Sequence, residues 1–416
     1  MRLLYVTTSY NAALLDRVHE EFLLRLIEQG HEATILVPDP SRDRTERWQI
    51  EHGAIDVVRP AVSMTRLDRI LNRISIALTE YSHFLTFLRT YLQYLRQHPE
   101  FDIIHVESVY PLGAVAAIAS WFDRRPFVPT IRGGDLIADD AIGYGFARFK
   151  RVRWLLKLVF ARSAAIRAVS PMAARMAIQF GCPEAKIITI GRNIRDEYFE
   201  RDTAAFRMTS RATIRERYAQ INGRKVIVAA GRLLPVKGFD DLIKAMAALP
   251  DTIALICGPN RIDETIGDYG AYLANLTQEK GVQDRVIFTG GIPREEMAMY
   301  FASADVLAVP SLIEGGNRTV LEGAALGVPF VASDTAGTPD FFQPNEGIAV
   351  PPQRPDLLAA ALATILHETA EQWAQRSAAC EQRAQQFYSP QVATTVVRAY
   401  QAIIARLSAK SQQSLI

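Results

Sequence analysis

The sequence predicts an α/β fold made of two doubly wound, Rossmann-like domains that face a deep cleft. Short apolar runs alternate with helical segments in the first half of the chain, and the alternation restarts in the second half. A polar, highly charged stretch separates the halves. The length of 416 residues allows two domains of roughly 200 residues, each with a core of its own. A cleft is expected because ligands bind at the carboxyl ends of parallel strands, which both sheets can offer.

The first domain is assigned to residues 1–200. Its expected strands are the apolar runs RLLYVTT, EATILVP, DIIHVES, PFVPTIR, AAIRAVS and KIITIG. A helix from about Leu14 to Gln29, closed by Gly30, joins the first two strands into a βαβ unit. Residues 65–96 carry a long helical periodicity with mixed charge. Six strands with helices between them predict a doubly wound sheet.

Residues 201–224 are expected to form a helical connector, because they are polar and charged. The second domain is assigned to residues 225–390, with strands at KVIVAAG, TIALICG, RVIFTGG, ADVLAVP, VPFVAS and GIAV. The remaining segment, 391–416, is expected to be a terminal helix that returns to the first domain and ends in a frayed polar tail.

The overall composition is that of an ordinary globular protein. Hydrophobic residues make up 49% and charged residues 22% of the chain, and the net charge of +2 gives no argument for nucleic-acid binding. The three cysteines are far apart and match no metal-ligand spacing, which favours a reducing compartment. The start of the chain reads as a strand and no apolar run is long enough to cross a bilayer, so we expect a cytoplasmic protein.

The segment Pro310–Ser333 places two carboxylates, those of Glu314 and Glu322, eight residues apart across a strand-to-helix turn. Exposed N–H groups at the start of such a helix attract phosphate, and glycines let a ligand approach the backbone. A carboxylate suits sugar hydroxyls, so Glu322 is predicted to hold a ribose and Glu314 to face the group that the phosphate carries. The predicted contacts between them are Gly315, Gly316, Asn317, Arg318 and Thr319. For two glutamates alone, an acid-decorated helix start is the alternative interpretation.

Two cations follow an earlier strand of the same domain. Gly231 ends the run KVIVAAG, Arg232 follows it, and Lys237 lies five residues after Arg232, before the next helix. An arginine binds two phosphate oxygens in a fork and a lysine adds a point charge, which together suit a departing diphosphate. A solvated basic loop is the alternative for these two residues taken alone.

The ordered series GRLLPVKGFDDL, RVIFTGGIPREEMAMYFASADVLAVPS and EGGNRTVLEGAALGVPFVAS resembles the donor-binding half of retaining GT-B glycosyltransferases. The similarity is to the large E-x(7)-E family, glycosyltransferase family 4-like or group 1, of bacterial polysaccharide and lipid-linked glycan enzymes. It is strong over residues 225–350 and looser over the first 200. The resemblance implies that Arg232 and Lys237 hold the donor diphosphate, that Glu314 contacts the transferred sugar, and that Glu322 binds the ribose.

The first half departs from the family pattern in three places. The opening loop carries Ser9, Tyr10 and Asn11 where relatives usually have paired glycines. The His-Gly-x-Asp signature appears as Arg132-Gly133-Gly134-Asp135, and the turn before the connector is changed to residues 192–195, RNIR. An arginine stays cationic and cannot act as a base, so Arg132 is predicted to clamp an anionic acceptor or assist the diphosphate. The alternative is a structural pair of Arg132 with Asp135 or Asp139.

A basic stretch without acidic residues runs from 141 to 183. It holds eight lysines and arginines: Arg148, Lys150, Arg151, Arg153, Lys157, Arg162, Arg167 and Arg175. A helix from about Phe146 to Arg162 is expected, with an apolar face and a separate basic face. Two interpretations are open and compatible: residues 146–175 contact an anionic membrane surface or a lipid diphosphate, or the helix packs its apolar face inside the domain.

Together these features predict a retaining transferase that moves a sugar from a nucleoside diphosphate sugar to a hydroxyl of a glycan or lipid-linked acceptor, in cell-surface polysaccharide biosynthesis. The catalytic set is Arg232, Lys237, Glu314 and Asp135, with Tyr10, Asn11, Arg132, Gly133 and Asp135 on the acceptor side. No Asp-x-Asp pair follows an apolar strand, so no metal is expected. A UDP-sugar is preferred to a GDP-sugar as donor. The alternatives are a nucleotide-sugar epimerase on the same fold and a donor-binding protein that has lost catalysis.

Overall fold

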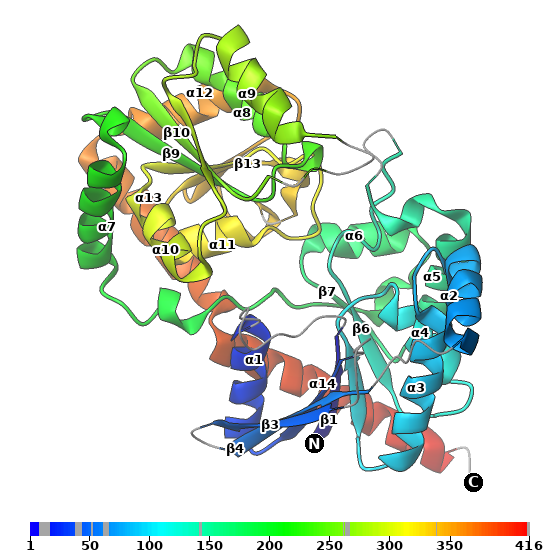
Figure 1. Cartoon of the computed structure of the whole chain (residues 1–416). Coiled ribbons are helices and arrows are strands. Elements are labelled where there is room, and N and C mark those ends of the chain that lie inside the picture. The colour runs from blue at the N-terminus through cyan, green and yellow to red at the C-terminus, as the bar shows by residue number, and fades with distance from the viewer. Residues whose placement is uncertain are drawn as a thin grey trace. The chain divides into compact units, whose positions relative to one another are not determined.

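The computed structural model describes residues 1–7, 17–37, 44–50, 53–60, 66–140, 144–260, 262, 267–337 and 339–413. The chain forms two compact units (Figure 1). The first comprises Met1–Asp140, Tyr144–Asn193 and Ser389–Ile416, and the second Ile194–Tyr388. Each unit is a parallel α/β sheet covered by helices, which agrees with the two Rossmann-like domains predicted.

The sheet of the first unit has eight strands in the order β3-β4-β2-β1-β5-β6-β7-β8. Their bounds are β1 Arg2–Val6, β2 Glu32–Leu36, β3 Arg44–Ile50, β4 Gly53–Arg59, β5 Ile103–Val106, β6 Phe127–Ile131, β7 Ile166–Ala168 and β8 Ile187–Thr189. All neighbours are parallel except β3 and β4, which form an antiparallel pair at the sheet edge. The prediction of six strands missed this pair, because β3 reads RTERWQI and lacks the apolar run of a buried strand.

The helices of the first unit are α1 Arg17–Glu28, α2 Arg66–Thr79, α3 Phe84–Gln97, α4 Leu112–Ala119, α5 Lys150–Arg162, α6 Pro171–Gln179 and α14 Ser389–Gln413, with short 3₁₀ turns at Phe146–Arg148 and Glu184–Lys186. The long periodic stretch 65–96 is two helices, since Glu80 and His83 adopt positive φ and break it. Helix α5 begins at Lys150 and not at Phe146. The last helix, α14, packs against α1, and its Val396 and Tyr400 are fully buried.

The sheet of the second unit has six parallel strands in the order β11-β10-β9-β12-β13-β14. Their bounds are β9 Lys225–Ala230, β10 Thr252–Cys257, β11 Val286–Gly290, β12 Val306–Val309, β13 Phe330–Ser333 and β14 Gly347–Val350. All six match apolar runs identified in the sequence. The strand order turns at β9, which pairs with β10 on one side and β12 on the other. Such a switch point leaves a crevice at the carboxyl ends of the two diverging strands, where ligands bind.

Seven helices of the second unit are α7 Thr203–Arg217, α8 Phe239–Ala245, α9 Tyr269–Glu279, α10 Arg294–Ser303, α11 Arg318–Ala325, α12 Pro355–Leu366 and α13 Ala370–Ala384. The 3₁₀ turns are Asp196–Tyr198, Ala219–Ile221, Pro235–Lys237, Met246–Ala248, Asp334–Ala336, Pro339–Phe341 and Gln385–Phe387. The expected connector carries α7, which packs on α10. Arg207 of α7 donates to the carbonyls of Ala304 and Leu326, so α7 is part of the second unit.

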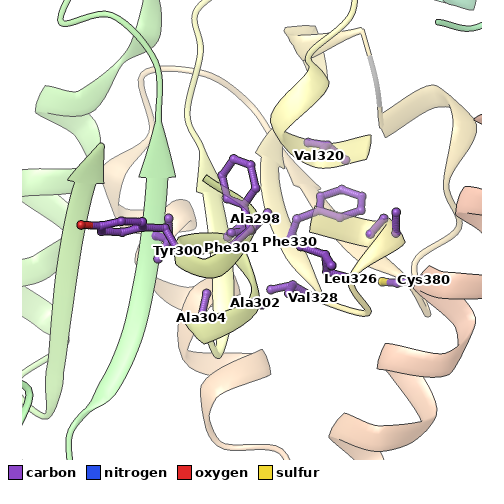
Figure 2. Packing of buried hydrophobic residues seen from close by; sticks show 14 of the residues in the cluster. Ala298, Tyr300, Phe301, Ala302, Ala304, Val320, Leu326, Val328, Phe330 and Cys380 are labelled. Carbon is purple, nitrogen blue, oxygen red and sulfur yellow. The ribbon is translucent and has the colours of Figure 1, made fainter. Parts of the chain in front are cut away.

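The core under α11 holds the candidate site in place. Side chains from α10, α11 and β13 gather there in one cluster, with Phe301 and Phe330 among them (Figure 2). Truncating one such buried phenylalanine to alanine costs about 3–5 kcal/mol. Gly323 lets α11 lie close to β12, because a Cβ at this position would be 2.0 Å from Cδ1 of Leu307. The position of Glu322 therefore depends on its glycine neighbour.

Candidate functional site

Two loops of the second unit meet because β9 and β12 are neighbours in the sheet. The loop after β9 runs to Gly238, and the loop after β12 begins at Pro310. The Leu312 N–H donates to the carbonyl of Val236 over 2.9 Å. Gly238 has a φ of +64°, and a Cβ there would lie 2.0 Å from the Pro310 carbonyl oxygen. Strand order thus joins two motifs about 80 residues apart in sequence.

Lys237 and Glu314 form an ion pair at this junction, through Nζ and Oε1. The side chains are 20% and 16% exposed, so solvent screens them only in part. Ser311 Oγ donates to the same Oε1 over 3.0 Å, and the Glu314 N–H donates to the Thr335 carbonyl over 3.0 Å. The structure brings these two predicted residues together, with Glu314 oriented by its own loop.

Gly231 and Arg232 precede Lys237 on the loop that follows β9. Gly231 has a φ of +154°, and a Cβ there would lie 3.1 Å from Cε of Lys237, so the glycine leaves room for the lysine side chain. The side chain of Arg232 is exposed. An exposed guanidinium and a half-buried ammonium on one short loop can bind neighbouring phosphate oxygens.

Helix α11 begins beside the ion pair. Asn317 is its N-cap, and the Asn317 side chain accepts the Thr319 N–H over 2.8 Å. Gly315 and Gly316 precede the cap. A further glycine, Gly337, packs onto this loop: its φ is +73°, and a Cβ would lie 2.8 Å from the carbonyl oxygens of Glu314 and Gly315. The sequence analysis missed Gly337, although a glycine directly after the strand VPFVAS and its short turn was a usable signal.

Glu322 lies one turn into α11 and is half-buried. Burial raises the pKa of its carboxyl group above the ordinary value, and the positive charges of Arg318, Arg195 and Arg294 partly lower it again. The sequence analysis predicted Arg318 at the site but missed Arg195 and Arg294. Arg195 lies in the altered turn at residues 192–195 and Arg294 begins α10, and both are so far from Glu322 in sequence that no spacing around Glu322 identifies them.

Arg195 is held firmly next to Glu322. Its side chain is 3% exposed and pairs with Glu197. Its Nη2 donates to the Tyr198 hydroxyl over 3.1 Å and to the Arg294 carbonyl over 2.9 Å. The altered turn at residues 192–195 therefore supplies a fixed cation to the second unit.

In the first unit, Asp135 is buried and its carboxylate organises the turn after β6. It accepts the N–H of Gly133 over 2.9 Å, the N–H of Val109 over 3.1 Å, and the N–H of Arg132 over 3.3 Å. Burial raises the pKa of Asp135, while these backbone hydrogen bonds lower it. The Asp135 carboxylate thus accepts hydrogen bonds from backbone N–H groups, including that of Arg132.

The guanidinium of Arg132 lies beside the carboxylate of Glu107 and not beside that of Asp135. Arg132 Nε lies 3.6 Å from Oε1 of Glu107, the residue that follows β5. Glu107 is buried and accepts a hydrogen bond from the Tyr5 hydroxyl. The alternative in which Arg132 pairs across its own turn did not consider this partner. Because β5 and β6 are neighbouring strands, Glu107 and Arg132 meet at their carboxyl ends.

His105 lies on β5, two residues before Glu107, and is fully buried. Its ring contacts the Thr130 hydroxyl at 3.1 Å and the Tyr400 hydroxyl of α14. Burial lowers the pKa of His105, which favours the neutral ring. Both ring nitrogens of His105 therefore have partners inside the core, so His105 has a structural role in the first unit. The predicted acceptor-side residues Tyr10 and Asn11 lie outside the described residues.

Two family models match the chain in sequence order. The model of the glycosyl transferase 4-like domain matches residues 17–193, and that of glycosyl transferases group 1 matches residues 210–387. The chain belongs to the group 1, glycosyltransferase 4-like family. The second match contains Arg232, Lys237, Glu314 and Glu322, and the first contains the Arg132 turn.

Two curated glycosyltransferases are similar in sequence to part of this chain. A GDP-mannose-dependent alpha-(1-6)-phosphatidylinositol monomannoside mannosyltransferase of Mycobacterium tuberculosis is 34% identical over 200 residues, covering 46% of this chain and 49% of the relative. The putative teichuronic acid biosynthesis glycosyltransferase TuaC of Bacillus subtilis is 27% identical over 268 residues, covering 64% and 62%. The chain spans about half the length of the first of these relatives.

Solved structures of the GT-B fold match nearly the whole chain. Sucrose-phosphate synthase of Thermosynechococcus elongatus has a TM-score of 0.75 at 18% identity and covers 97% of this chain and 99% of its own. Anabaena HepE in complex with UDP-glucose has a TM-score of 0.70 at 18% identity, covering 97% and 100%. At this identity, the similarity shows the fold alone. The fold of this family member is therefore GT-B, as the sequence resemblance predicted.

Proposed function

We propose that this protein is a retaining glycosyltransferase. It moves a sugar from a nucleoside diphosphate sugar to a hydroxyl of a glycan or lipid-linked acceptor in cell-surface polysaccharide biosynthesis. The observation that supports this most is the Lys237–Glu314 ion pair beside the start of α11, with Glu322 one turn further on. Glu314 suits the sugar, Lys237 and the helix N-terminus suit the diphosphate, and Glu322 suits the ribose, which are the successive parts of a sugar nucleotide.

The donor roles follow from these contacts. Arg232 and Lys237 bind the diphosphate with the N–H groups of residues 315–318, and Glu322 accepts hydrogen bonds from the ribose hydroxyls. A diphosphate oxygen competes with Glu314 for the Lys237 ammonium. Donor binding then frees Glu314 Oε1 for a sugar hydroxyl, with the Ser311 hydroxyl still bound to it. Arg195 and Arg294 oppose the effect of burial on Glu322 and favour the ionised form that accepts two hydroxyls.

The proposed chemistry is attack on the same face of the sugar as the leaving group. The bond from the anomeric carbon to the diphosphate oxygen breaks while the bond to the acceptor oxygen forms, and the acceptor proton passes to the leaving diphosphate. Configuration is kept without a protein nucleophile. Lys237 and Arg232 stabilise the negative charge that grows on the diphosphate, and we propose that they do so without a metal ion.

On the acceptor side, we propose that Arg132 binds an anionic group of the acceptor. Asp135 and Gly133 shape the turn that presents it, and Glu107 limits the rotamers of the arginine. The cytoplasmic face of a membrane is the proposed location. The mycobacterial and Bacillus relatives are named for a phosphatidylinositol mannoside and for teichuronic acid, which supports an acceptor of this kind.

A donor panel tests this proposal. Thermal shift with UDP-, GDP- and ADP-sugars should identify one donor that raises the melting temperature, with UDP-sugars first in the order of testing. That donor, incubated with lipid-linked and soluble glycan acceptors in the presence of a chelator, should give a product whose anomeric configuration by NMR matches the donor. An epimer formed without acceptor would favour the epimerase, and tight binding without transfer to any acceptor would favour a binding protein.

A further inference from the structure

Helix α2 of the first unit exposes large apolar side chains and buries two hydroxyl side chains. Ile70 is 57% exposed, Ile74 41% and Leu78 58%, so a stripe of large apolar side chains at a spacing of four faces solvent. On the opposite side, Ser75 is 0% and Thr79 5% exposed. A helix that packs on a domain normally buries its apolar stripe and exposes its hydroxyls. Here the two faces are exchanged.

Hydrogen bonds hold α2 in this orientation. The Ser75 hydroxyl accepts the Leu85 N–H over 3.0 Å, and the Asn72 side chain accepts the His83 N–H over 2.6 Å. Both bonds cap the backbone at the start of α3, which follows α2 directly. Rotating α2 to bury its isoleucines would break both bonds and leave backbone donors unpaired. The exposed stripe therefore belongs to the packed structure of the first unit.

Most of the charged residues of α2 are positive. Arg66, Arg69 and Arg73 lie beside it at spacings of three and four, and all three are exposed. The sequence of α2 contains Asp68 as its one acidic residue. Basic side chains next to an apolar stripe are the pattern of helices that lie in the interface of an anionic bilayer.

Helix α5 lies next to α2 and extends the same chemistry (Figure 1). Arg151 Nη1 lies 3.5 Å from Oε1 of Glu80, the residue that follows α2. Trp154 is 64% exposed, with exposed Lys150 and Lys157 around it on the outer side of α5. The inner side of α5 is the buried apolar face, which includes Val152, Leu156 and Phe160. The predicted apolar face of α5 thus packs inside the unit, and α2 supplies the apolar contact in its place.

We propose that the exposed sides of Arg66–Thr79 and Lys150–Arg162, the α2–α5 face, dock on an anionic lipid bilayer. Ile70, Ile74, Leu78 and Trp154 enter the interface between headgroups and acyl chains, and the arginines and lysines pair with lipid phosphates. A second copy of this chain is a poorer partner, because a twofold contact would bring these cations against themselves. The link to a lipid-linked acceptor rests on the proposed function, but the docking does not depend on it.

Vesicle co-sedimentation of the full chain tests the docking. We expect binding to phosphatidylcholine vesicles with about 30% phosphatidylglycerol, little binding to pure phosphatidylcholine, and release at about 0.5 M salt as charges are screened. The double variant Ile70→Ser/Ile74→Ser should bind about tenfold more weakly, since two apolar side chains no longer enter the interface. The matched control is Ile178→Ser on α6, which removes an isoleucine that is 43% exposed in the same unit. This control should bind like the parent protein.

A second readout places the protein on the bilayer. Lipids brominated in the acyl chains should quench the fluorescence of Trp154, and Trp154→Phe should lose that quenching while it keeps its melting temperature. Absence of binding to anionic vesicles at low salt, or equal binding by the double variant, would overturn the proposal. So would light scattering that shows a dimer in the parent and a monomer in the double variant.

Donor thermal shift separates this proposal from the proposed function. The double variant should bind the donor as the parent does, because α2 lies in the first unit and the donor loops lie in the second. If no donor binds but anionic vesicles do, the proposed function fails and the docking stands. If the donor binds and is transferred to a soluble acceptor without any vesicle binding, the docking fails and the function stands.

Discussion

Glu314 and Asp135 are both carboxylates that follow a buried parallel strand, yet their oxygens have different partners. Glu314 contacts two side chains, Lys237 and Ser311, whereas Asp135 accepts backbone N–H groups from Val109, Arg132 and Gly133. Side chains can exchange their partner for a ligand with small movements. Backbone donors cannot do so without distorting the turn. The partners of Glu314 therefore allow a ligand to replace them, whereas the partners of Asp135 fix the shape of the turn that carries Arg132.

The largest effect should come from Lys237→Ala. We propose that the Lys237 ammonium contacts the leaving diphosphate, so its removal should lower kcat about 100-fold or more, because such a charge contact strengthens in the transition state. Steady-state kinetics with saturating donor and acceptor measure the effect. Lys244→Ala is the matched control, since Lys244 pairs with Asp240 and Asp241 on α8 and should leave kcat within about twofold. Equal rates for the parent and Lys237→Ala would refute the assignment.

Isosteric amides test the contrast between the two carboxylates directly. Glu314→Gln should lower kcat about tenfold, since the amide orients the sugar less well, and leave the free energy of unfolding nearly unchanged. Asp135→Asn should lower the free energy of unfolding by about 1–2 kcal/mol, because one oxygen that accepts backbone N–H groups becomes an NH₂ group. Urea denaturation and initial rates measure both quantities. Loss of stability in the Glu314 variant with none in the Asp135 variant would reverse the comparison.

Arg132→Ala should affect the acceptor and not the donor. We expect kcat/KM for an anionic acceptor to fall about tenfold, with the donor dissociation constant unchanged, since Arg132 lies in the first unit. Arg132→Lys should not restore the rate if the arginine binds through its fork. Glu107→Gln is the companion variant and should weaken acceptor binding less, because it removes a partner of the arginine and leaves the guanidinium. A donor affinity that falls in step with the acceptor affinity would contradict the division of roles.

The smallest effect is the pH dependence at Glu322. Burial raises the pKa of this carboxyl, so it protonates at a higher pH than the ordinary value of about 4.3. The protonated form accepts the ribose hydroxyls less well, so donor affinity should fall as the pH drops through the raised pKa. Isothermal titration with the cognate nucleoside diphosphate at several pH values measures this fall. In the variant Glu322→Gln, the affinity should change with pH only through the ionisation of the nucleotide phosphates. A pH profile of affinity identical to that of the parent protein would contradict the role of Glu322 in donor binding.

The raised pKa of Glu322 affects donor affinity and folding stability in opposite directions as the pH changes. Glu322 binds its proton more tightly in the folded state, so its contribution to stability is complete below the ordinary pKa and is lost as the pH rises through the raised pKa. Donor binding and folding therefore favour different protonation states of one residue. A nucleotide that stabilises the protein more at neutral than at acidic pH would agree with this relation.

The predicted elements of the second unit were found because each is local in sequence. All six strands are apolar runs bounded by turns, and the loops around Lys237 and Glu314 directly follow two of them. In the first unit, the antiparallel pair of β3 and β4 and the break between α2 and α3 were missed. An edge strand needs no apolar run, and the break depends on positive φ at Glu80 and His83.

By itself, the sequence determined the fold class, the two loops that we propose bind the donor and the substitution of arginine at position 132, because these depend on residues close together in the chain. Tertiary structure decided which of these residues meet. The pairs Lys237–Glu314 and Arg132–Glu107 exist because particular strands are neighbours, and Arg195 and Arg294 reach Glu322 from distant segments. Periodicity predicted two faces for the helix near residues 146–162, but only the packing decided that α5 turns its apolar face inward and that α2 exposes its isoleucines. The physical reason is that hydrogen bonds between α2 and the start of α3 select the orientation of α2, and such contacts are not encoded in a local pattern.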